Sequence, residues 1–150
     1  MVLGVVVVVI AGFLLARSQS PDNTPEISEE VPINTDETEN RLEEVLGRTL
    51  PEDAERAALK DTTGSGFTGI ATRAEDNGVV EFTILADLSD PGDGVYQVWA
   101  GESADKLTSL GTLTSAKGGY LFEYRQSGSL EDYNSVVIKM GEDTILQGSF

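Results

Sequence analysis

The chain has 150 residues, which is about the size of one domain. Ten basic residues stand against twenty-six acidic ones, and the resulting net charge of −16 would repel phosphate backbones, so we expect no nucleic-acid binding. The chain has no Cys and no His, which excludes disulfides and thiol chemistry and removes the commonest general base and transition-metal ligand.

The first segment, residues 1–17, reads "MVLGVVVVVIAGFLLAR" and is apolar from Val2 to Ala16. Fifteen residues of helix rise about 23 Å, somewhat less than the roughly 30 Å hydrocarbon core of a bilayer. The side chain of Arg17 can extend to the membrane surface and reduce this difference. We therefore predict an N-terminal membrane helix, with a cleaved secretion signal as the alternative. Both place the rest of the chain outside the cytoplasm.

Residues 18–40 hold three prolines, many acidic residues and no basic residue, so we predict an acidic disordered tether. Residues 41–61 are predicted to form a short helical stalk or flap. Asn34 or Thr35 can cap its first helix, and Leu42, Val45 and Leu46 share one face of it. Pro51 is typical of the first turn of a second helix, which an alanine-rich stretch would continue to Leu59.

Residues 62–150 change to period-two alternation with glycine-containing turns, which indicates short strands. In residues 79–88 five apolar side chains alternate with mostly polar ones, and the preceding Asp76-Asn77-Gly78 is a strong hairpin signal. The spacing predicts an all-β domain, a seven-stranded antiparallel β-sandwich of the immunoglobulin-like type. The predicted strands are 67–73, 79–88, 95–100, 107–114, 120–126, 133–140 and 144–150.

Few residues suggest chemistry, and we predict no catalytic residue and no cofactor. Asp87, Asp90 and Asp93 recur at three-residue spacing in the loop "DLSDPGDG", which makes them weak calcium candidates. The alternative is an ordinary surface turn, because Pro-Gly-Asp-Gly is common turn chemistry.

Tyr96 and Trp99 are the large aromatic residues of one predicted strand. Their spacing gives them opposite parity, so a regular strand cannot direct both into the core. We expect Trp99 to be buried, at a cost of about 3–5 kcal/mol for Trp99→Ala, and Tyr96 to lie at the edge with its hydroxyl in water.

The stretch "GVYQVWAGE", residues 94–102, carries the pattern Tyr-x-x-Trp, and "LGTLTSAKGGYLFEY", "LEDYNSVVIKMGED" and "ILQGSF" follow it. In these motifs the chain resembles the extracytoplasmic C-terminal domain of anti-sigma-K factors. It also resembles single-anchor envelope proteins of uncultured bacteria, which share "GIATR" and the terminal "GSF". Anti-sigma factors carry a sigma-binding domain before their membrane helix, and none precedes Val2. The resemblance therefore implies a sensor-like outer domain without the output domain.

These observations predict a single-pass membrane protein whose outer domain is a non-enzymatic binding or sensing module. Its expected partners are the membrane, through the N-terminal helix, and an unknown envelope protein or glycan. The alternatives are a purely structural or adhesive envelope protein, or a hydrolase that cleaves cell-wall glycan with a pair of carboxylates.

Overall fold

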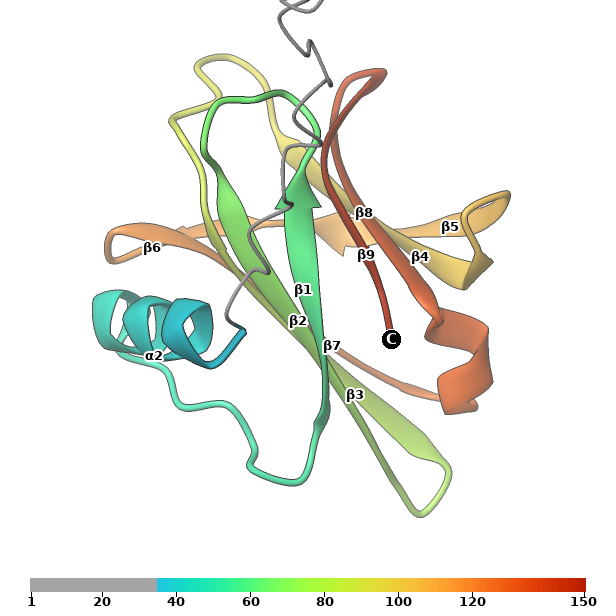
Figure 1. The fold of residues 1–150 in the computed structure, drawn as a ribbon. Helices are drawn as coiled ribbons and strands as arrows, with labels where there is room; N and C mark the ends of the chain where they lie inside the picture. The colour runs from blue at the N-terminus through green and yellow to red at the C-terminus, as the bar shows by residue number, and fades with distance from the viewer. Residues whose placement is uncertain (1–34) are drawn as a thin grey trace, which may run out of the picture. The chain divides into compact units, whose positions relative to one another are not determined.

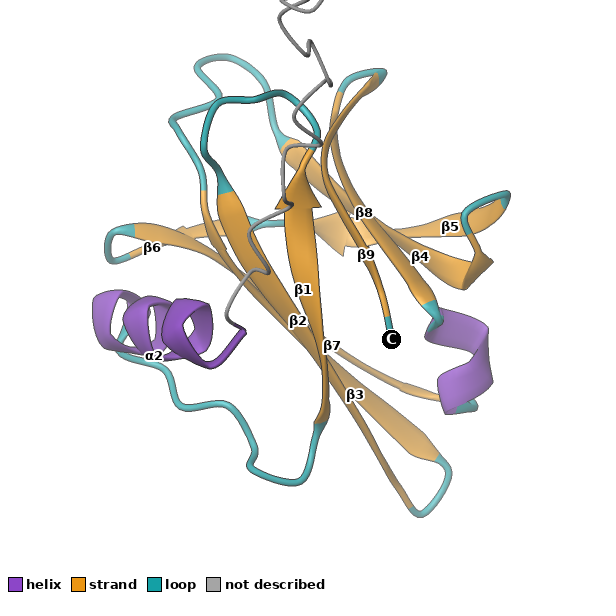
Figure 2. Ribbon diagram, viewed as in Figure 1, coloured by secondary structure: helices purple, strands orange, loops and turns teal. Residues whose placement is uncertain are grey.

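A computed structural model describes residues 35–150 of the chain, so the predicted membrane helix and most of the predicted tether lie outside the described residues. The described part is mostly β, with one α-helix, α2 (Thr35–Leu46), and one 3-10 turn, η1 (Leu130–Tyr133) (Figure 2). None of the helices within this range is long and apolar enough to cross a membrane. The strands are β1 (Glu55–Asp61), β2 (Thr68–Asp76), β3 (Val79–Asp87), β4 (Tyr96–Ser103), β5 (Lys106–Thr112), β6 (Thr114–Ala116), β7 (Gly119–Ser127), β8 (Ser135–Met140) and β9 (Asp143–Ser149).

All nine strands belong to one antiparallel sheet with the order β5-β4-β8-β9-β1-β2-β3-β7-β6 (Figure 1). The two edge strands, β5 and β6, are separated in sequence by Leu113 alone. One bent stretch of chain thus pairs with β4 through its first part and with β7 through its second. The sheet is therefore nearly closed into a barrel.

The hairpin between β2 and β3 confirms the strongest local signal in the sequence. Asn77 and Gly78 have φ values of 54° and 75°, the left-handed geometry that a two-residue hairpin turn requires. The alternating apolar residues of β3, from Val80 to Ala86, all lie in the main core. A second, smaller core lies on the outside of the sheet, where Leu42 of α2 packs with Ile70 and Leu85.

The structure confirms an antiparallel β domain but corrects its details. Nine strands form a single nearly closed sheet in place of seven strands in two stacked sheets. The predicted second helix is wrong, because residues 55–61 form β1, which pairs with β2 and then with β9. Its alanines fit between neighbouring strands, so pairing outweighs their helix propensity. The first helix begins at Thr35, inside the segment predicted as tether.

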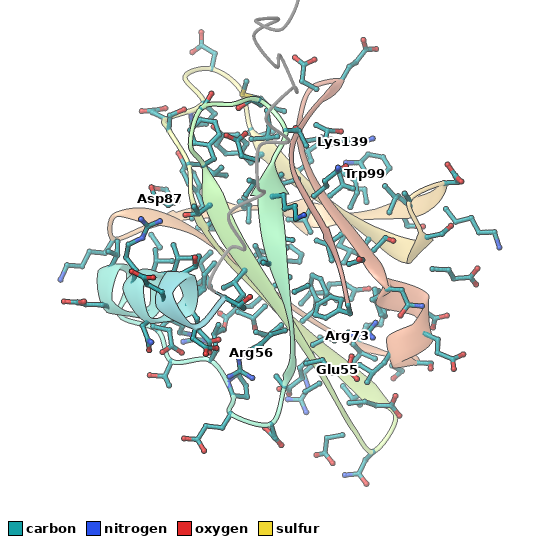
Figure 3. The ribbon with its side chains drawn as sticks, viewed as in Figure 1. Glu55, Arg56, Arg73, Asp87, Trp99 and Lys139 are labelled. Atoms are coloured by element: carbon teal, nitrogen blue, oxygen red, sulfur yellow. The ribbon has the colours of Figure 1, made fainter. Side chains whose placement is uncertain are left out.

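Arg73 is the buried charged residue of the described chain, with 7% of its surface exposed. Its Nε donates to Glu55 Oε2 over 2.7 Å, and its Nη1 donates to the carbonyl oxygens of Leu130 and Tyr133 over 2.8 and 3.1 Å. Its guanidinium also lies 4.4 Å from the ring centre of Phe150. Figure 3 shows Arg73 beside Glu55. Arg73 therefore joins β1 and β2 to η1 and to the end of the chain.

We predict that Arg73→Ala lowers the free energy of unfolding by about 3 kcal/mol, because it leaves buried carbonyl groups without a donor. The matched control is Arg125→Ala, which removes a pair with Glu81 whose side chains are 69% and 50% exposed. That change should cost at most about 1 kcal/mol. Urea denaturation of both variants measures the difference, and equal losses would contradict the structural role of Arg73.

Candidate functional site

The predicted calcium candidates do not come together. Asp87 lies at the end of β3, and its Oδ2 is 3.8 Å from Nη2 of Arg41 in α2. Asp90 Oδ1 accepts a hydrogen bond from the Gly92 N–H over 2.8 Å. Both are exposed, as is Asp93. Across residues 35–150, no group of three or more acidic side chains is placed to hold a metal ion. Within the described residues, this loop therefore offers turn chemistry and no cluster of acids that could hold a metal ion.

The prediction for Tyr96 and Trp99 is wrong, because Tyr96 is the more deeply buried of the two. Tyr96 is 3% exposed, donates its hydroxyl hydrogen to the Ser89 carbonyl over 3.0 Å and packs edge-on against Tyr120. Trp99 is half-buried on the opposite side of β4. Val98 and Ala100, which flank Trp99, both point into the core, so the parity of the strand directs the indole outward.

Lys139 of β8 covers the outward-facing indole. Its Nζ lies 5.0 Å from the centre of the Trp99 ring, within the range of a cation–π contact (Figure 3). The indole Nε1 is buried and has no hydrogen-bond partner among the described residues. A buried N–H without an acceptor costs about 1–3 kcal/mol, so the position of the indole is set by the strand and not by hydrogen bonding.

The outer side of strands β1, β9, β8 and β4 forms a continuous surface around this pair. Register places Trp99 opposite Val137, Val137 opposite Gln147, and Gln147 opposite Lys60. At the usual strand spacing, this row spans about 14 Å from Trp99 to Lys60. We call this surface the Trp99 face, which consists of Ala58, Lys60, Gln97, Trp99, Ser135, Val137, Lys139, Gln147 and Ser149.

The charge of the Trp99 face differs from that of the whole chain. None of its nine residues is acidic and two are lysines, in a chain whose net charge is −16. A hollow of about 490 Å³ lies beside Val137 in this face, and its lining, which includes Lys60, Gln147 and Ser149, also has no acidic side chain. Local positive charge can attract an anionic group at short range, although the net charge opposes a polyanion at longer range. The face can thus accept an anionic or hydroxyl-rich ligand.

Sequence reasoning missed the Trp99 face because its residues come from four separate stretches of the chain. The available signal is weak: Lys60 and Lys139 are two of only ten basic residues in the chain. Strand order and register were needed to place them on one surface.

Asp61 is a second residue that sequence reasoning missed. Its carboxylate accepts hydrogen bonds from the N–H groups of Thr63, Gly66 and Phe67 over 2.7, 2.7 and 3.3 Å, and from the Thr63 hydroxyl over 2.7 Å. Partial burial raises the pKa of Asp61, but these hydrogen bonds together outweigh it and lower the pKa from 3.8 to about 2. The loop after β1 is therefore organised around one carboxylate.

A comparison with protein-family models finds no match, and comparisons with curated proteins and with solved structures find none either. The resemblance to the outer domain of anti-sigma-K factors therefore stays a prediction.

We predict that Asp61→Asn lowers the free energy of unfolding by about 1 kcal/mol at pH 7, a value kept small because the loop borders solvent. The folded-state pKa of about 2 lies below the ordinary value of 3.8, so this contribution is present above pH 4 and is lost as the pH falls towards 2. Urea denaturation at pH 7, 4 and 2 measures it, with Asp93→Asn as an exposed control. A deficit of the Asp61→Asn variant that is as large at pH 2 as at pH 7 would contradict this account.

Proposed function

We propose that this chain is a membrane-tethered, extracytoplasmic binding module without enzymatic activity, and that the Trp99 face binds its ligand. The observation that carries the proposal is the position of Trp99 and Lys139 on an acid-free surface of a chain with net charge −16. The apolar segment of residues 1–17 supports the tether, and the resemblance to anti-sigma-K factors supports a sensing role outside the cytoplasm.

The chemistry of the Trp99 face favours an envelope glycan that carries anionic groups. Lys139 can pair with a carboxylate or a phosphate, and Gln147 and the two serines can bond hydroxyl groups. An aromatic ring with a polar edge is suited to the apolar face of a sugar and to its hydroxyls. The row from Trp99 to Lys60 is long enough for several contacts along one extended polymer.

The distribution of ion pairs supports the same ligand class. On the other outer surfaces of the barrel arginines are paired with carboxylates, as in Arg56 with Glu39 and Arg125 with Glu81. Lys139 instead lies over an aromatic ring, and no carboxylate of residues 35–150 forms an ion pair with it. An anionic ligand would therefore meet a charge that the fold has not cancelled.

We predict that polygalacturonate, an anionic polysaccharide, binds the purified chain and changes its tryptophan emission, whereas neutral dextran does not. Trp99 is the single tryptophan, so the signal reports on this face alone. Lys139→Gln should weaken binding about tenfold, the effect of losing one charge-assisted contact of roughly 1.4 kcal/mol. Added salt should weaken binding further.

Lys117→Gln serves as the control, because Lys117 is an exposed lysine in the turn between β6 and β7. Equal losses for Lys117→Gln and Lys139→Gln would indicate attraction to charge alone and contradict a specific face. No change of emission with polygalacturonate would favour the structural or adhesive alternative.

A further inference from the structure

The barrel is incomplete on one side, and two free strand edges border the opening. Gly119 to Leu121 of β7 pair with β6, whereas the rest of β7 pairs only with β3. Among the strands of residues 35–150, β5 likewise pairs on one side only, with β4. The two edges diverge from Leu113, where the chain passes from one half of the sheet to the other.

Both free edges line one hollow of about 600 Å³. Leu107 and Leu110 reach it from β5, Tyr124 and Gln126 from β7, and Tyr133 from η1. The tyrosine rings meet edge-on with their centres 6.0 Å apart. The opening therefore combines an apolar and aromatic floor with unpaired backbone groups at its borders.

We propose that this opening binds an extended peptide from another protein, which adds as a strand along the free edge of β7 or β5. An extended backbone is the ligand that best matches a strand edge, since it presents N–H and C=O groups at the same two-residue spacing. The free stretch of β7, from Phe122 to Ser127, spans about 20 Å and accommodates roughly six peptide residues. Alternate side chains of the peptide would rest on Tyr124, Tyr133 and Leu110.

Charge selects the kind of peptide. Glu102, Lys106 and Asp132 lie at the rim of the hollow. Lys106 Nζ donates to Glu102 Oε2 over 2.8 Å, so these two charges cancel and Asp132 gives the rim a net negative charge. A peptide with apolar residues at alternate positions and at least one Lys or Arg fits this rim. Residues 18–34 of this chain carry four acidic residues and no basic one, which makes them a poor occupant. A second copy, also with net charge −16, is disfavoured for the same reason.

This site is independent of the Trp99 face, which lies on the outer side of β4, β8, β9 and β1. Each can therefore be tested without the other.

The experiment selects peptides from a phage-displayed library of random 12-residue sequences on the full chain, with an unrelated acidic protein for subtraction. Each selected peptide is then synthesised in two series, one with N-methyl groups on the odd-numbered backbone nitrogens and one with them on the even-numbered ones. Strand addition uses the N–H groups of one parity only, so one series should lose binding at least tenfold while the other changes less than about threefold.

Gln126→Arg adds bulk and positive charge in the hollow. It should lower the affinity for a basic peptide at least tenfold. Asn40→Arg is the matched control, because Asn40 is an exposed position of α2 outside both proposed sites, and it should leave peptide affinity unchanged. Circular dichroism establishes that both variants are folded. The proposal is overturned if no peptide is enriched, if the two N-methyl series behave alike, or if Asn40→Arg weakens peptide binding as much as Gln126→Arg.

Discussion

Side chains alternate along β4 between the core and the outer surface of the barrel. The composition of both the core and the Trp99 face depends on this alternation. Tyr96 and Trp99 are three residues apart, so one of them must leave the core. Tyr96 can enter because its hydroxyl finds the Ser89 carbonyl at 3.0 Å, which satisfies the polar end of the ring. Trp99 is consequently placed outside, where Lys139 lies over it. Core packing therefore creates the surface to which we assign binding.

Closure of the sheet produces the second surface. Strand β1 passes from pairing with β2 to pairing with β9, and the stretch from β5 to β6 passes from β4 to β7. These two crossings turn nine short strands into one nearly closed barrel and leave few free edges. Arg73 and η1 hold the chain together where β1, β2 and the last strand meet. Where β5 and β7 diverge, no strand of the described residues pairs with the edges that face the opening.

Local signals predicted what local interactions decide. The Asn77-Gly78 turn and the alternation of β3 are confirmed because a tight hairpin fixes its own register. The sequence from Pro51 to Leu59 favours a helix, but pairing of β1 with β2 and with the distant β9 determines its conformation. The Trp99 face needs strand order, register and the competition between two aromatic rings. None of these is available from a single sequence.

The central claim is that Trp99 lies on a locally positive face of a strongly acidic chain, and ionic quenching of its fluorescence tests that claim most directly. Iodide and caesium are compared at equal, low ionic strength, and Trp99 is the single source of the signal. Each quenching constant is divided by its value for free N-acetyltryptophanamide, because iodide is intrinsically the stronger quencher. The normalised constant should be about twice as large for iodide as for caesium despite the net charge of −16, because Lys139 attracts anions to the indole. In Lys139→Gln this preference should shrink. Caesium quenching as efficient as that of iodide, or no quenching by either ion, would contradict the account.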